Sequence, residues 1–149
     1  SADVFKGSLE KSPWVVKDLG PAGFPGLTMR VPKNAEIKKD PINNKVGHIN
    51  NMDGFAMWLM ASKLDVAKAT KDVEKGGLRP FKGWVEKKPD HLIYKFKGIT
   101  GKTQLYFQVA VKAGGKDYTC KMLGGISVSE KELPQVKQVV AACKTLKKK

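Results

Sequence analysis

Apolar and polar residues alternate along much of this chain, which is the pattern of strands that bury one side. The alternation is clearest at residues 103–112, where Leu105, Phe107 and Val109 share one face. Strand side chains point alternately to the two faces of a sheet, so a period of two predicts a half-buried strand. Shorter runs predict further strands at residues 14–16, 27–31, 35–38, 46–49, 82–87, 91–97 and 117–122. Short turns separate the last four strands, which predicts an antiparallel meander.

Residues 55–61 depart from this alternation. They read Phe-Ala-Met-Trp-Leu-Met-Ala and are apolar on both sides. Such a run is typical of a central strand that is covered on two faces. It therefore predicts a covering layer on each side of the sheet.

Two stretches have helical spacing instead. In the first, Ser62 is the predicted N-cap, with Asp65 as a short capping partner, and Gly76 and Gly77 end the helix. The second begins near Ser129, which has capping-box spacing to Glu132. The buried stripes are Val66, Ala69 or Thr70, and Val73 in the first helix, and Leu133, Val136, Val139, Val140, Cys143 and Leu146 in the second. Lysines 144 and 147–149 are expected at the carboxyl end of the second helix, where the helix dipole favours cations.

These elements predict one α+β domain over residues 13–149, in which an antiparallel sheet is sandwiched between helices. Residues 1–12 are small, polar and charged, and are expected to form a flexible lead-in. A length of 149 residues and a hydrophobic fraction of 41% fit a single packed domain. The longest continuous apolar run, residues 55–61, is far shorter than the roughly 20 residues that cross a bilayer. No transmembrane segment is expected.

The only two cysteines lie on predicted buried faces, Cys120 in the last strand and Cys143 in the last helix. A separation of 23 residues is unlike the Cys-x-x-Cys spacing of redox-active pairs, so a structural disulfide is expected. In a cytosolic protein the two would more often be separate buried thiols. The chain begins Ser1-Ala2-Asp3. We expect either that a leader has been removed from an exported protein of the periplasm, cell envelope or medium, with lipid anchoring through that leader as one option, or that the sequence is a fragment.

The net charge of +14 is almost entirely due to lysine, since Arg30 and Arg79 are the only arginines. Lysine is a hydrated point charge, whereas arginine usually reads bases. The excess therefore favours diffuse attraction to an anionic protein, lipid head group or polymer, without specific nucleic-acid readout. The candidate contact residues are Lys95, Lys97, Lys144 and Lys147. The alternative is that the lysines serve solubility alone.

No catalytic or cofactor motif is found. His48 and His91 are the only histidines, and neither has a second ligand at metal-site spacing. Residues 98–103 end in Gly-Lys-Thr, but two residues separate their glycines instead of the four of a phosphate-binding loop. The expectation is a protein that is not an enzyme and uses no cofactor or metal.

The carboxyl-terminal third resembles a family of small exported domains. Residues 114–120 read Gly-Gly-Lys-Asp-Tyr-Thr-Cys, residues 129–133 Ser-Glu-Lys-Glu-Leu, and residues 141–146 Ala-Ala-Cys-Lys-Thr-Leu. Residues 24–35, Phe-Pro-Gly-Leu-Thr-Met-Arg-Val-Pro-Lys-Asn-Ala, are similar in outline to the opening strand and turn. Over residues 20–147 the order of elements resembles the PsbP-like and DcrB-like α/β group, which includes many uncharacterised bacterial lipoproteins. The resemblance implies a sheet between helices (α/β/α) and a binding or assembly role, with no shared catalytic residue to transfer.

Three hypotheses for function follow. The first is a non-enzymatic binding or assembly protein of the cell envelope, whose lysine-rich surface contacts an anionic partner. The second is a carrier with an apolar cleft between sheet and helix, lined by Trp58, Trp84 and Tyr94. The third is an enzyme assembled from distant residues, which would require His48 or His91 to meet carboxylates in a cleft. The sequence leaves the oligomeric state open.

Overall fold

The structure is a computed structural model that describes residues 13–51, 53–122 and 127–149. The predicted lead-in, residues 1–12, lies outside the described residues. The elements in chain order are β1 (Trp14–Asp18), the 3-10 turn η1 (Gly20–Ala22), β2 (Leu27–Pro32), β3 (Glu36–Lys39), β4 (Val46–Asn50), β5 (Ala56–Met60), α2 (Val66–Lys75), β6 (Phe81–Lys87), β7 (His91–Lys97), β8 (Thr103–Ala113), β9 (Lys116–Lys121), the 3-10 turn η2 (Glu130–Glu132), α3 (Leu133–Cys143) and β10 (Lys147–Lys148).

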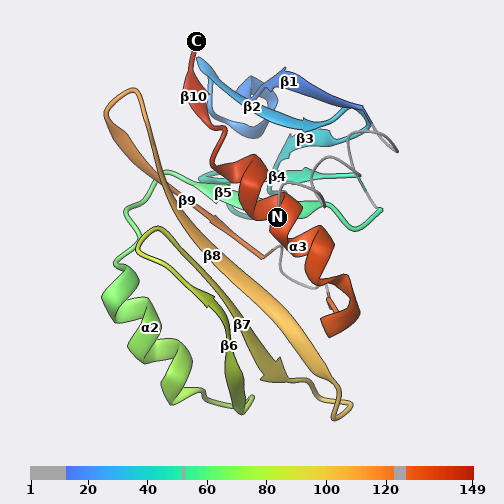
Figure 1. The fold of residues 1–149 in the computed structure, drawn as a ribbon. Coiled ribbons are helices and arrows are strands. Elements are labelled where there is room, and N and C mark those ends of the chain that lie inside the picture. Colours follow the sequence, from blue (N-terminus) through green and yellow to red (C-terminus); the bar gives the residue numbers. More distant parts are fainter. Residues whose placement is uncertain (1–12, 52, 123–126) are drawn as a thin grey trace.

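Seven strands form one antiparallel sheet in the order β3-β4-β5-β9-β8-β7-β6 (Figure 1). The predicted meander is confirmed, because β6, β7, β8 and β9 are neighbours in chain order. The predicted strands at residues 35–38 and 46–49 are also present, as β3 paired with β4. β8 is the longest strand, with 11 residues, and extends well beyond β9 with its 6.

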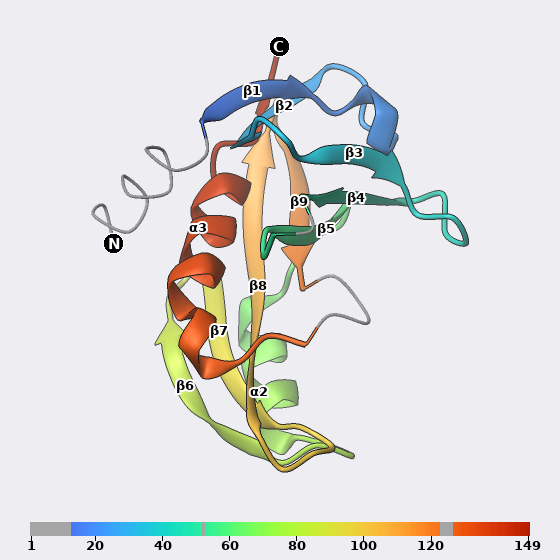
Figure 2. The same cartoon turned by 90° about the vertical axis from the view of Figure 1, so that its right-hand side faces the viewer.

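Each face of the sheet carries one helix (Figure 2). On one face α3 packs through Val136, Val139 and Val140 against the large core, which includes Phe107 of β8 and Leu59 of β5. On the other face Ala69 and Val73 of α2 pack with Leu92 and Tyr94 of β7. The fold is therefore mixed α+β, with mainly antiparallel strands and two helices.

Strand β5 is not covered equally on its two faces. Met57 and Leu59 are fully buried, whereas Trp58 and Met60 on the other face are only half-buried. The reason is that the apolar cluster beneath α2 is built from β6, β7 and β8 and includes no residue of β5. The predicted layer on each side of the sheet is present, but it covers the second face of β5 only partly.

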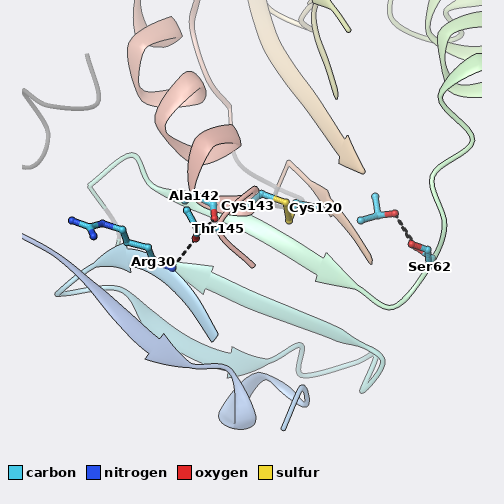
Figure 3. The surroundings of a disulfide bond; sticks show 7 residues. Arg30, Ser62, Cys120, Ala142, Cys143 and Thr145 are labelled. Atoms are coloured by element: carbon cyan, nitrogen blue, oxygen red, sulfur yellow. Dashed lines mark hydrogen bonds between the residues drawn. A yellow bond between two sulfur atoms is a disulfide. The ribbon is translucent and has the colours of Figure 1, made fainter. Parts of the chain in front are cut away.

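A second, three-stranded sheet has the order β1-β2-β10. Lys147 and Lys148 belong to it as β10, paired with Thr28 and Leu27 of β2. The expectation that the final lysines sit at the end of the last helix is wrong, because α3 ends at Cys143. Thr145 turns the chain there, since its hydroxyl donates to the carbonyl of Ala142 (2.6 Å) and accepts from the backbone N–H of Arg30 (2.8 Å) (Figure 3).

The disulfide between Cys120 and Cys143 is confirmed (Figure 3). It joins β9 to the last residue of α3 across a Cα–Cα distance of 6.4 Å, and both cysteines are fully buried. The capping box of Ser129 and Glu132 is also present, although it first caps η2, and α3 follows from Leu133.

The N-cap of α2 is Asp65, whose carboxylate accepts a hydrogen bond from the backbone N–H of Lys68 (3.0 Å). The prediction that Ser62 caps this helix is wrong. Its hydroxyl instead donates to Oγ1 of Thr119 on β9 (3.2 Å), and the Thr119 hydroxyl donates to the carbonyl of Ser62 (3.0 Å). Ser62 therefore ties the segment before α2 to the sheet.

Candidate functional site

An apolar pocket of about 230 Å³ lies between the sheet and α3. It is located where β9 ends and β5 begins, and its lining is mostly apolar. The lining residues are Asn50, Gly54, Phe55, Ala56, Phe107, Met122, Val128, Glu132, Val136 and Val139.

The difference in strand lengths explains this position. β9 pairs with β5 only from Trp58 to Met60, so Ala56 at the start of β5 has no β9 partner among the described residues. β8 continues past the end of β9, because Gln108 is already opposite Lys121, the last residue of β9. The described strands thus leave a space between β5 and the first half of β8, over which α3 lies.

The chain beyond this space is anchored to β8 and to the start of the helix. The backbone N–H of Leu105 donates to the carbonyl of Val128 (2.8 Å), which fixes Val128 as one wall of the pocket. Glu132 lines the pocket and accepts a hydrogen bond from the backbone N–H of Ser129 (3.3 Å). Val136 and Val139 are three residues apart and share one helix face. The capping box therefore sets the position of the wall that these two valines form.

The walls of this pocket suit an apolar ligand. Phe55, Phe107 and the two valines offer hydrocarbon surface, while Asn50 and Glu132 are the polar groups. Binding pockets combine mainly apolar walls with a few polar groups in this way. The volume exceeds the roughly 150 Å³ of an engineered cavity that holds benzene, but is below the roughly 300 Å³ at which drug-sized pockets begin.

The three aromatic residues of the predicted cleft lie elsewhere. Trp84 and Tyr94 are in contact, with ring centroids 5.9 Å apart, in the cluster beneath α2. The indole N–H of Trp84 donates to Glu74 of α2 (2.9 Å). Trp58 shares their sheet face but lies three strands from Tyr94 and four from Trp84, about 14 Å and about 19 Å at the usual strand spacing. None of the three lines the pocket at α3.

Trp58 takes part in a side-chain network on the open part of the sheet. Its indole N–H donates to Nε2 of His48 (2.8 Å), and this imidazole nitrogen of His48 also lies 2.6 Å from Oδ1 of Asp40. The pKa of Asp40 is lowered, first by hydrogen bonds from the backbone N–H groups of Asn43 and Ile42 and then by His48. Both contacts use one imidazole nitrogen, so this network joins β4 and β5 to the turn that follows β3.

His91 forms a second network, at the start of β7. Its Nε2 lies 3.1 Å from Glu86, and its Nδ1 lies 2.8 Å from Nζ of Lys144 and 3.1 Å from Asp90. Lys144 also forms an ion pair with Asp90 at 3.1 Å. Burial raises the pKa of both carboxyl groups, but the contacts with His91 for Glu86 and with Lys144 for Asp90 outweigh it and lower both pKa values.

Both histidines therefore meet carboxylates, but the enzyme hypothesis also requires a cleft, and neither histidine lines the pocket at α3. The Nε2 of His48 and both nitrogens of His91 are engaged by protein groups, and His91 is only 7% exposed. These contacts fit structural hydrogen bonds that hold elements together better than a base that faces a substrate. Within the described residues, no three His, Cys, Asp or Glu side chains gather as a metal site would require.

The four lysines proposed for an anionic partner do not form one patch. Lys95 lies 3.7 Å from Glu130, and Lys144 belongs to the His91 network. Lys97 is exposed at the end of β7, whereas Lys147 is exposed in β10, at the other end of the molecule (Figure 1).

The sequence pattern placed Phe55, Phe107 and Val136 on buried faces but did not reveal that a pocket opens between them. One signal was available. The run at residues 103–112 is clearly longer than the run at 117–122, so the first strand had to extend past its hairpin partner.

No family model, curated protein or solved structure matches this chain. Among the described residues, neither α-helix has the length and apolar character needed to cross a membrane.

Proposed function

We propose that this protein is a non-enzymatic binding protein that carries a small apolar molecule in the pocket between the sheet and α3. The observation that supports this function is the pocket itself, with its largely apolar lining and a volume of about 230 Å³. It is the carrier hypothesis with a different set of lining residues, in which Phe55, Phe107, Val136 and Val139 replace the predicted aromatic cleft.

The size and lining restrict the ligand class. A single-ring aromatic or a short hydrocarbon chain matches the volume better than a drug-sized molecule does. Glu132 and Asn50 are placed to contact a polar end of the ligand. An uncharged or cationic polar end is expected, because a carboxylate ligand would be repelled by Glu132.

The test uses butylbenzene, a neutral single-ring probe that matches the pocket volume, and isothermal titration calorimetry measures its binding. The wild-type protein should bind it, and an alkane-chain alcohol should displace it. Val136→Phe places a ring in the pocket, so it should abolish probe binding while the free energy of unfolding changes little.

Val140→Phe is the matched control. Val140 is buried in the same core from the same helix but does not line the pocket. Its enlargement should cost about 1–3 kcal/mol of stability, because a filled core resists extra volume, and should leave probe binding intact. Equal destabilisation by both changes, or probe binding that survives Val136→Phe, would refute the carrier function.

A second candidate function is contact with an anionic protein, lipid head group or polymer through the lysine-rich surface. One observation favours it. Among the described residues, the lysines within ion-pair distance of a carboxylate are Lys38, Lys95, Lys112, Lys144 and Lys149. They are a small part of the 28 Lys and Arg residues of the chain, of which Lys6 and Lys11 lie outside the described residues. Retention on a heparin column at low salt, with elution as salt rises, is the expected result. A protein that is not retained would exclude this function.

We also propose that the protein is exported and belongs to the PsbP-like and DcrB-like group. The Cys120–Cys143 disulfide supports export, since such bonds persist in oxidising compartments. A sheet with one helix on each face is compatible with the group. Lipid anchoring stays a prediction.

A further inference from the structure

Two loops at one end of the seven-stranded sheet each expose a large aliphatic side chain. Leu78, between α2 and β6, is 105% exposed, and Ile99, in the turn between β7 and β8, is 91% exposed. The backbone N–H of Lys97 donates to the carbonyl of Pro80 (3.0 Å), which holds the two loops side by side. Both loops lie at the lower end of the molecule in Figure 1 and Figure 2.

The turn that carries Ile99 has a defined shape. The N–H of Gly101 donates to the carbonyl of Gly98 (2.9 Å), and the N–H of Gly98 donates to the carbonyl of Lys102 (2.7 Å). Gly101 has a φ of +84°, which favours glycine. A Cβ at Gly98 would lie 2.8 Å from the side chain of Gln104. These hydrogen bonds therefore fix the backbone of the turn in which Ile99 is exposed.

The two segments that carry these side chains bear only positive charges, and the acidic Glu130 nearby lies 3.7 Å from Lys95 of β7. Residues 75–82 and 97–103 contain no Asp or Glu. The cations in these segments are Lys75, Arg79, Lys82, Lys97 and Lys102, all exposed. Among the described residues none of them forms an ion pair, although Arg79 donates a hydrogen bond to the hydroxyl of Tyr106. The nearest acidic residue along the chain, Glu74, accepts a hydrogen bond from Trp84.

We propose that this end, residues 77–80 and 97–102, docks on an anionic phospholipid bilayer, with Leu78 and Ile99 entering the interfacial region and the five cations facing the head groups. This inference rests on the second candidate function, contact with an anionic partner, and is independent of the pocket.

Three properties favour a bilayer. Aliphatic side chains inserted among head groups, together with cations that attract anionic lipid, are the two components of interfacial binding. A protein partner would require a continuous contact surface of about 800 Å² on each side, whereas two adjacent loop tips with one aliphatic side chain each offer little. A nucleic-acid partner would be expected to stack bases on exposed aromatic rings, but the exposed apolar side chains at this end are aliphatic.

The experiment is sedimentation with vesicles of phosphatidylcholine containing about one third phosphatidylglycerol, compared with phosphatidylcholine alone. The wild-type protein should partition at least about tenfold more strongly to the anionic vesicles, and added salt should weaken the binding. The double variant Leu78→Asn/Ile99→Asn keeps every charge and should lose at least about tenfold in partitioning.

Ile42 provides a matched control. It is 95% exposed in the turn between β3 and β4, three residues from both Lys39 and Lys45 and two from Asp40, and antiparallel pairing places this turn at the opposite end of the sheet. Ile42→Asn should partition like wild type. The proposed surface would be overturned if Ile42→Asn and Leu78→Asn/Ile99→Asn lose vesicle partitioning equally, or if the double variant loses none.

Heparin retention separates this inference from the function on which it rests. The double variant should elute at the wild-type salt concentration, because its lysines are unchanged. A wild-type protein that binds heparin but not anionic vesicles contradicts the bilayer proposal alone. A protein that binds neither contradicts both.

Discussion

At the scale of single residues, Asp65 shows how capping chemistry decides where α2 begins. Its carboxylate accepts the N–H of Lys68, an N–H that has no partner within the first turn. Asp65→Ala should therefore cost about 1 kcal/mol of unfolding free energy and speed hydrogen exchange at Lys68. Urea unfolding and amide exchange measure the two effects.

Ser62→Ala is the comparison for this prediction. Ser62 was the cap expected from the sequence, but its hydroxyl contacts Thr119 on β9. Its loss should leave exchange at Lys68 unchanged. If Ser62→Ala speeds hydrogen exchange at Lys68 and Asp65→Ala does not, the assignment of Asp65 as the cap is contradicted.

Single residues also mark a limit of prediction from sequence. The spacing of Ser62 and Asp65 allows either to cap, and only the path of the chain toward Thr119 decides between them. The partners of His91 come from β6, from the preceding turn and from Lys144, which is 53 residues away. Such a contact follows from how α3 lies on the sheet, which local periodicity does not specify.

At the scale of elements, the disulfide fixes α3 to the sheet. Cys120 and Cys143 close a loop over a sequence separation of 23. In the chain-entropy model, a loop of this size contributes about 3 kcal/mol by restricting the unfolded chain. The double variant Cys120→Ala/Cys143→Ala should be less stable by about this amount in urea unfolding.

Reductant supplies the control. It should lower the stability of the wild-type protein toward that of the double variant and should not change the variant itself. A wild-type protein whose intact mass does not change by two hydrogens on reduction would show that the bond is absent.

Elements with strong local periodicity were predictable, and those defined by distant pairing were not. β8 and its hairpin partners follow from the alternation of residues 103–112 and from short turns. β10 has only two residues and exists because β2 offers a free edge. The pocket likewise depends on where β9 stops relative to β5 and β8, which is a relation between three strands.

At the scale of the whole molecule, the excess of positive charge makes the few carboxylates important for stability. With a net charge of +14, the folded protein repels itself, and each ionised Asp or Glu reduces this repulsion. Glu86 and Asp90 contact His91, and Asp90 also pairs with Lys144, so the network ties β6 and β7 to the end of α3. Loss of these two charges should loosen the packing of α3 on the sheet.

The pKa values of Glu86 and Asp90 are lowered in the folded protein, which sets the direction of the pH dependence. A carboxyl group with a lower pKa when folded stabilises the protein above its unfolded pKa of about 4, and this contribution disappears as pH falls through the folded value. Thermal unfolding from pH 7 to pH 3 should therefore show a falling Tm below about pH 4.

Glu86→Gln/Asp90→Asn should be less stable than wild type at pH 6, and this difference in stability should shrink toward pH 3. The control Glu36→Gln/Asp72→Asn removes the same charge at exposed positions, so its stability difference from wild type should change less between pH 6 and pH 3. If the stability difference between Glu86→Gln/Asp90→Asn and wild type stays constant with pH, these two carboxylates do not stabilise the fold by ionisation.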